Sequence, residues 1–146
     1  TMELRLSGIR DAWHGHNLRF SDRRVLLMVP SFSAKETEQL VSEWLHQQKG
    51  KDLPTAFLVG GDFMAAGTIS ALQKHGLRVP QDVRLASLYD DEALQGCTPQ
   101  ITAVSFDAEQ LGRRTAQQLL SLIRHQPVET RTLLGYQVGL RLSTQT

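Results

Sequence analysis

Cysteine is nearly absent from this 146-residue sequence, which excludes several classes of protein. The single Cys97 can form no disulfide within the chain and supplies no pair of thiolates for a zinc knuckle. No apolar run approaches the roughly 20 residues that span a bilayer, and the N-terminal residues contain no signal-peptide core. The 16 Lys and Arg residues nearly balance the 15 Asp and Glu residues. The resulting net charge of +1 provides no global field for nucleic acid or an anionic membrane.

What the sequence does contain is an ordinary globular composition. Hydrophobic residues make up 40% and charged residues 21%, which argues against disorder, collagen and fibrous repeats. A chain of this length is close to the commonest size of a single domain, with one core or two at most. We therefore expect a soluble, cytoplasmic, globular protein.

Short apolar runs alternate with helical segments along the first two thirds of the chain. The runs at 25–29, 55–59 and 83–88 are apolar throughout, which is typical of parallel strands covered on both faces by helices. The fold class predicted is α/β, with a parallel sheet and helices on both faces. One more amphipathic helix, at about 2–13, has no strand ahead of it.

Capping residues mark where the helices between these strands begin. Ser33 with Glu36 forms a capping box, and that helix extends to about Gly50. Asp62 is predicted to cap a second helix that ends near Gly76.

The pattern changes after Pro99. A strand is predicted at 101–106, a long amphipathic helix at 107–125 that begins with an Asp107 capping box, and a final strand at about 132–142. Glycines weaken that last strand and indicate a bulge or a close backbone approach. The acidic loop and the residues after it, 91–100, form the only candidate boundary between packing units.

Three segments follow the predicted strands: 30–33, 60–63 and 89–91. The carboxyl ends of parallel strands are where open α/β sheets bind ligands. These segments offer an aromatic side chain, glycines, helix N-terminal N–H groups and carboxylates, a combination that suits a hydroxyl-rich small molecule.

Each candidate also has a purely structural interpretation. Asp62 can be a helix cap, and Phe32 can be a hydrophobic staple for the helix that follows it. Asp90 and Asp91 can be solvated turn residues, and Arg5 can be a surface charge on its helix.

Chemistry of other kinds is weakly supported. His14 and His16 lack a third ligand nearby, so no metal site is predicted, and Cys97 is interpreted as a small packing residue. The sequence contains no dinucleotide fingerprint, P-loop, nucleophile elbow, HExxH or CxxC motif. We expect a ligand-binding module without a cofactor rather than an enzyme.

An ordered set of motifs resembles the lactose/galactose-repressor (LacI/GalR) family of bacterial transcription regulators. Single motifs would be weak, but the set spans essentially the whole chain at the spacing of the family. The motifs are PTAF at 54–57, GDFMAAG at 61–67, GLRVPQDV at 76–83, YDD at 89–91, TPQITAV at 98–104 and LG at 111–112.

The resemblance implies a periplasmic-binding-protein-like fold, in which two α/β subdomains joined by three crossovers bind ligand in a cleft. Residues 1–100 would form the C-terminal subdomain without its first strand. Residues 101–146 would form crossover segments and a helix associated with the N-terminal subdomain. The chain would then begin inside the effector-binding domain, as a fragment of a regulator.

The resemblance also assigns ligand-binding positions. Arg5 matches an arginine that bonds ligand hydroxyls or carboxylate, and Phe32 falls where an aromatic commonly stacks on a sugar. Asp90 matches an aspartate facing the cleft, and Phe106 lies near a crossover position that touches ligand. Gly61 stands where the family usually has an asparagine that bonds the effector, which leaves the identity of the effector open.

Regulators of this family dimerise partly through the helix corresponding to 62–75 and the loop after Asp91. Met64, Ala71 and Leu94 are therefore predicted to supply apolar contacts to a homodimer. Operator DNA would be bound only through a helix-turn-helix domain that has no counterpart in this chain.

Three functions compete. The leading one is the sugar-like effector-binding part of a transcriptional repressor, in which ligand shifts a hinge equilibrium. The alternative is a periplasmic-type sugar-binding protein for transport, against which the crossover motif at Thr98-Pro99 argues. The third is an enzyme of flavodoxin-like architecture.

Overall fold

The computed structural model describes residues 2–21, 33–48 and 53–145. These residues belong to two compact units, Thr1–Pro30 and Ser31–Thr146, which are described separately. The strand predicted at 25–29 and the candidate Phe32 lie outside the described residues.

In the first unit, the described residues 2–21 form one helix, α1 (Met2–Gly15), as the sequence predicts. The chain turns back after it, with the Leu18 N–H donating to the Trp13 carbonyl at 2.9 Å. The rings of Trp13 and Phe20 then meet edge to face at 6.1 Å between centroids. This aromatic contact stabilises the end of the helix.

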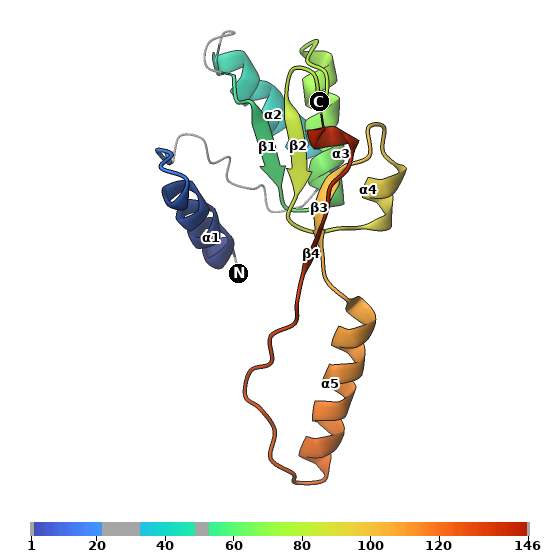
Figure 1. Ribbon diagram of the computed structural model, residues 1–146. Coiled ribbons are helices and arrows are strands. Elements are labelled where there is room, and N and C mark those ends of the chain that lie inside the picture. Colours follow the sequence, from blue (N-terminus) through green and yellow to red (C-terminus); the bar gives the residue numbers. More distant parts are fainter. Residues whose placement is uncertain (1, 22–32, 49–52, 146) are drawn as a thin grey trace. The chain divides into compact units, whose positions relative to one another are not determined.

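The second unit is built on a four-stranded sheet with strand order β1-β2-β3-β4 (Figure 1). The strands are β1 (Ala56–Val59), β2 (Arg84–Ser87), β3 (Thr102–Ser105) and β4 (Gln137–Gly139). The first three are parallel and β4 is antiparallel to β3. The α/β class with a largely parallel sheet is confirmed, although β4 is much shorter than the strand predicted at 132–142.

The helices of this unit agree with the sequence at three places and add a fourth. The four are α2 (Ala34–Gln48), α3 (Asp62–Lys74), α4 (Glu92–Gly96) and α5 (Ala108–Ile123), followed by a 3-10 turn η2 (Leu142–Thr144). Helix α4 replaces what the sequence indicated as loop. It was missed because one turn is too short to show helical periodicity.

Two predicted helix caps are present as hydrogen bonds. The Glu36 N–H donates to Ser33 Oγ at 3.2 Å, and the Gln110 N–H donates to Asp107 Oδ1 at 2.8 Å. The Ser33 hydroxyl in turn donates to the Glu36 carboxylate, so this box is closed between the two side chains. The polar residues therefore determine where α2 and α5 begin.

The core of the second unit lies between the sheet and the helices α3 and α4. It consists of buried side chains from β1, β2, β3 and these two helices: Val59, Ala65, Leu85, Leu94, Ile101 and Ala103. Helix α5 contributes nothing to this core, because all of its side chains are at least partly exposed.

Helices α2 and α3 pack closely because α3 carries glycine at their contact. A Cβ at Gly67 would lie 2.3 Å from the Ala34 carbonyl oxygen. Polar groups close the same contact, since Glu38 accepts hydrogen bonds from Ser70 Oγ and Lys74 Nζ.

Candidate functional site

The register of the sheet places three chain segments at one edge. Val59 pairs with Ser87 and Ser87 pairs with Ala103, so β1, β2 and β3 all end at the same side. Two backbone hydrogen bonds extend this alignment beyond the strands: Leu88 N–H to the Val59 carbonyl and Asp90 N–H to the Val104 carbonyl, each at 2.8 Å. The segments after the strands therefore form one continuous edge, as the parallel topology requires.

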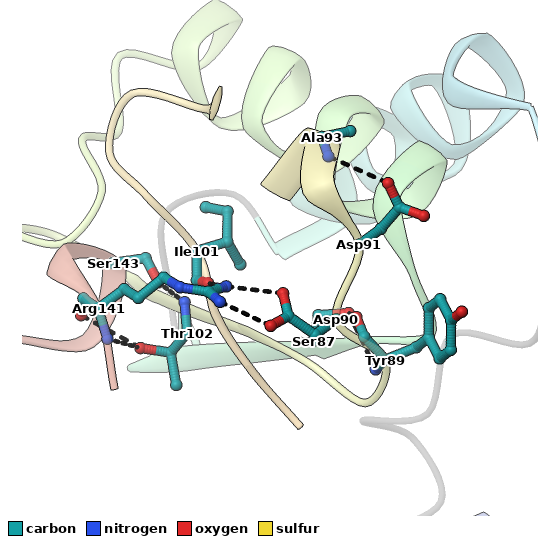
Figure 2. A network of polar contacts seen from close by, with 9 residues as sticks. All are labelled: Ser87, Tyr89, Asp90, Asp91, Ala93, Ile101, Thr102, Arg141 and Ser143. Atoms are coloured by element: carbon teal, nitrogen blue, oxygen red, sulfur yellow. Dashed lines mark hydrogen bonds and ion pairs between the residues drawn. The ribbon is translucent and has the colours of Figure 1, made fainter. Parts of the chain in front are cut away.

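The best-defined polar group at this edge is an ion pair between Asp90 and Arg141 (Figure 2). Arg141 Nη1 donates to Asp90 Oδ1 at 2.8 Å, and Nη2 donates to Oδ2 at 2.6 Å. The Asp90 side chain is only 11% exposed and that of Arg141 only 16%. Because two parallel hydrogen bonds join these side chains and little solvent reaches them, the carboxylate and the guanidinium are held in one relative orientation.

Arg141 is held at both ends of its side chain. Its Nη1 also donates to the Ile101 carbonyl at 2.7 Å, and its backbone N–H donates to Thr102 Oγ1 at 2.8 Å. The hydrogen bonds to Asp90 raise the pKa of Arg141 above its ordinary value, while burial lowers it to a smaller extent. The guanidinium is therefore a fixed cation at the sheet edge.

Two more residues of the C-terminal segment attach it to the sheet. Ser143 is fully buried, donates from Oγ to the Leu85 carbonyl at 2.6 Å and accepts from the Thr102 N–H at 2.8 Å. Thr144 Oγ1 and Thr102 Oγ1 lie 2.6 Å apart. Sequence reasoning missed this network, because its partners are about 40 to 60 residues apart and no local pattern connects them.

An aromatic pair lies beside the polar network. The rings of Tyr89 and Phe106, which follow β2 and β3, are 5.6 Å apart between centroids and tilted at 54°. Each residue is 41% exposed, so ring surface remains open to solvent. Tyr89 was not singled out as a ligand-binding residue, although it lies in the candidate segment 89–91 and directly precedes Asp90 in the YDD motif.

Gly61 and Asp62 occupy the start of α3 in a different way from the one predicted. Gly61 is the N-cap, in extended backbone that any residue adopts, and Asp62 is the first helical residue. The prediction that Asp62 caps α3 is wrong, because no side chain makes the cap hydrogen bond. A Cβ added at Gly61 would meet nothing within 4 Å, so the glycine leaves open space at the edge.

The other candidates divide between the two compact units. Asp91 caps α4 by accepting from the Ala93 N–H at 3.0 Å, which is the structural role that the sequence left open. Arg5 is an exposed residue of α1 in the first unit.

The residues predicted to form a dimer interface differ in exposure. Ala71 and Leu94 are 0% exposed and fill the core of their own chain, so their apolar surface is already used. Met64 is partly buried and packs against the same core. Of the three, only Met64 keeps surface for an apolar contact with another subunit.

A shallow hollow lies away from this edge. It measures about 430 Å³ and is lined by residues at the end of α3 and in the loop after it, among them Ile69, Gln73 and Val79. Helix α3 starts at the carboxyl edge of the sheet, so its last turn lies toward the amino edge. The hollow is thus separate from the candidate ligand edge.

Two classes of site receive no support from the described residues. No group of three or more His, Cys, Asp or Glu side chains within 2–21, 33–48 and 53–145 is arranged to hold a metal ion. In the same part of the chain, no helix combines the length and apolarity needed to cross a membrane.

The fold and its edge define a class of protein: an open α/β sheet with polar and aromatic side chains beyond the ends of its strands, the place where such sheets bind small ligands. Residues 1–144 match the family of the periplasmic binding protein-like domain. The chain belongs to this family.

Curated relatives of the chain are transcription regulators. It is 33% identical over 100 residues to the HTH-type transcriptional regulator GalR of Streptococcus thermophilus, covering 67% of this chain and 30% of that protein. It is 31% identical to the lactose operon repressor of Escherichia coli K12, covering 97% of this chain and 37% of that protein. The chain thus spans about a third of the length of these relatives.

Solved structures agree with this assignment. The transcription regulator CcpA of Lactococcus lactis superposes with a TM-score of 0.81 and 26% identity, covering 97% of this chain and 50% of that one. The lac repressor dimer bound to operator and the anti-inducer ONPF gives a TM-score of 0.81 and 27% identity, covering 99% and 48%. The resemblance to LacI-family regulators seen in the sequence motifs is confirmed.

Proposed function

We propose that this chain is the effector-binding part of a bacterial transcriptional repressor. The observation that carries the proposal is the family match across residues 1–144, together with curated relatives that are repressors and regulators rather than enzymes. Binding of a small effector would shift the relative populations of two hinge states. No chemical reaction is part of this function.

The ligand would be bound at the carboxyl edge of the sheet. Asp90 would accept hydrogen bonds from ligand hydroxyls, and the exposed rings of Tyr89 and Phe106 would cover an apolar ring face. Gly61 and Asp62, at the start of α3 on the same edge, would add to the site, and a Cβ at Gly61 would meet open space. We retain Arg5 and Phe32 as ligand-binding candidates on the resemblance alone.

A sugar-like molecule suits this combination of a carboxylate and aromatic rings. A LacI family regulator from Arthrobacter was solved in complex with lactose, and it superposes on this chain with a TM-score of 0.67 and 26% identity. Because Gly61 lacks the amide that the family usually places there, we expect a ligand that relies more on ring contact than on that hydrogen bond.

We further propose that the chain divides functionally near residue 100. Residues 1–100 would form the C-terminal subdomain, and residues 101–146 would form crossover segments and a helix associated with the N-terminal subdomain. The exposure of every α5 side chain supports this division, because an amphipathic helix needs a partner for its apolar face.

Partners follow from the same proposal. The regulator would be a cytoplasmic homodimer in which Met64 contributes apolar contact, and a helix-turn-helix domain outside this chain would bind operator DNA. The near-neutral charge of the chain itself is consistent with DNA binding elsewhere.

A ligand screen tests the proposal. The full-length protein encoded by the gene would be heated with lactose, galactose, glucose and their phosphates, and its melting temperature recorded. We expect at least one sugar to raise the melting temperature. The substitutions Arg5→Ala and Asp90→Ala should weaken the binding of that sugar and reduce the rise. Asp82→Ala removes a carboxylate in the loop before β2 and should leave ligand binding unchanged. If no sugar binds, or both site variants bind as well as wild type, the proposed site is wrong.

The alternative, a sugar-binding protein for transport, has the same fold. The two are separated by mobility-shift measurements with the full-length protein and the promoter region of its own operon. Sequence-specific retardation that the bound sugar changes supports the repressor, whereas sugar binding without any DNA retardation supports transport.

A further inference from the structure

We propose that Arg141 is a positioning residue that orients the Asp90 carboxylate for the ligand and makes ligand binding depend on the seating of the C-terminal segment 137–144. The inference rests on the proposed function, because it concerns the same ligand edge. It assigns a role to a residue that the sequence did not single out.

The first observation is that both oxygens of Asp90 are already engaged. Each accepts one hydrogen bond from Arg141, at 2.8 and 2.6 Å. A carboxylate oxygen can accept more than one hydrogen bond, so each keeps acceptor capacity for a ligand donor. The direction of that remaining capacity is set by Arg141, because the bidentate pair fixes the plane of the carboxylate.

The second observation is that Arg141 is itself immobilised by the first residue of β3 and the residue before it. Its guanidinium donates to the Ile101 carbonyl at 2.7 Å, and its backbone N–H donates to Thr102 Oγ1 at 2.8 Å. Asp90 also bonds to β3, through its N–H and the Val104 carbonyl at 2.8 Å. The two partners therefore share one rigid strand as their support.

The third observation concerns the contact of the guanidinium with β4. A Cβ at Gly139 would lie 3.4 Å from Arg141 Nη2 and 3.6 Å from Cζ, which is ordinary van der Waals distance. The guanidinium therefore packs beside the backbone of β4 while its donors pair with Asp90.

These contacts connect the ligand edge to the end of the chain. Asp90 and Arg141 are 51 residues apart, and Ser143 anchors the same segment to the Leu85 carbonyl of β2. If β4 and η2 leave the sheet, Asp90 loses its orienting partner and its carboxylate is no longer held in one plane. Ligand affinity should therefore be lower when the C-terminal segment is displaced than when it is in place.

A double-mutant cycle separates positioning from general stabilisation. Arg141→Lys keeps the positive charge but cannot form two parallel hydrogen bonds to one carboxylate. In the full-length protein, we expect Arg141→Lys to raise the dissociation constant of the sugar found in the screen by about tenfold, measured by isothermal titration calorimetry. In an Asp90→Asn background, Arg141→Lys should weaken binding no further, because its effect passes through Asp90.

Two further variants keep the test sharp. Ser143→Ala removes two hydrogen bonds that anchor the same segment and leaves the atoms of the ion pair in place. It should lower the melting temperature and, by loosening the segment, weaken sugar binding by less than Arg141→Lys does. Gly139→Ala is the matched control beside the guanidinium: its Cβ would lie at ordinary van der Waals distance, 3.4 Å from Arg141 Nη2, so it should leave both the ion pair and the affinity unchanged.

The outcomes distinguish this inference from the function beneath it. If wild type binds no sugar, the proposed function fails and this inference falls with it. If wild type binds but Arg141→Lys binds equally well, or the two substitutions act additively on affinity, Arg141 is a structural residue only and the inference is overturned while the proposed function stands.

Discussion

At the scale of single residues, a few close contacts leave no room for a larger side chain. Gly67 is the clearest, because a Cβ there would fall 2.3 Å from the Ala34 carbonyl oxygen and 2.7 Å from Thr37 Cβ. These are backbone and near-backbone atoms, so relief requires that α2 move away from α3. A glycine in mid-helix is otherwise unfavourable by propensity, and its presence here has a packing reason.

Gly67→Ala should therefore destabilise the protein by about 1–3 kcal/mol, measured by urea unfolding. Gly112→Ala is the matched control, because a Cβ at that helical glycine meets nothing within 4 Å. The control should stabilise slightly, by about 0.5–1 kcal/mol from helix propensity. Equal effects of the two substitutions would contradict the contact between α2 and α3.

Glu38 makes the same helix contact sensitive to pH. The hydrogen bond from Lys74, and then that from Ser70, hold the pKa of Glu38 below its ordinary value of 4.5. A depressed folded-state pKa contributes stability above the unfolded value, and this contribution is lost as pH falls through the folded value.

We expect Glu38→Gln to reduce the free energy of unfolding at pH 7 and to have progressively less effect between about pH 5 and pH 3. Urea unfolding at each pH measures the difference. Lys74→Met removes the hydrogen bond that lowers the pKa of Glu38 most. In that background, the effect of Glu38→Gln on the free energy of unfolding should vary less with pH. A difference that stays constant from pH 7 to pH 3 would exclude the ionic contribution of Glu38.

At the scale of secondary-structure elements, most of the pattern was readable from local signals. Ser33 and Asp107 predict the starts of α2 and α5 because a side-chain cap acts within a few residues. Helix α4 was missed because it is too short to show helical periodicity, and β4 is shorter than predicted because its extent depends on pairing with the distant strand β3. The cap of α3 was assigned to Asp62 one residue too late, since extended Gly61 takes that position without a side chain.

Helix α5 is the element whose apolar face lies open in this chain. Leu119 and Leu120 are 56% and 50% exposed, whereas Leu72 of α3 is fully buried. Leu120→Gln should change the stability of the 146-residue chain by less than about 0.5 kcal/mol, because leucine and glutamine have similar helix propensities. Leu72→Ala, the buried comparison, should cost about 2–5 kcal/mol in the same urea unfolding experiment.

A loss above about 1 kcal/mol for Leu120→Gln in the isolated chain would show that this face is already packed. In the full-length protein, the proposed association of α5 with a second subdomain predicts a larger loss for the same substitution.

At the scale of the whole molecule, exposed apolar side chains accumulate on the C-terminal part of the second unit. Large hydrophobic residues that are more than half exposed include Leu119, Ile123, Leu133, Tyr136 and Leu140. Open apolar surface of this kind promotes association. The isolated chain should therefore self-associate at roughly 100 μM, measured by sedimentation velocity.

The double substitution Leu119→Gln and Leu120→Gln should reduce this association, and Gln73→Ala, an exposed site at the end of α3, should leave it unchanged. A monomeric wild-type chain at that concentration would contradict the expectation.

The α/β class, the family and the order of the described strands and helices other than α4 followed from the sequence alone, because apolar periodicity, caps and ordered motifs are local properties of the chain. The pairing of Asp90 with Arg141, the packing of that guanidinium beside β4 and the burial of Ala71 and Leu94 were decided by the tertiary structure. The physical reason is distance along the chain: these contacts join segments whose meeting depends on how the sheet is assembled, and residue types alone do not determine which partner a buried charge finds.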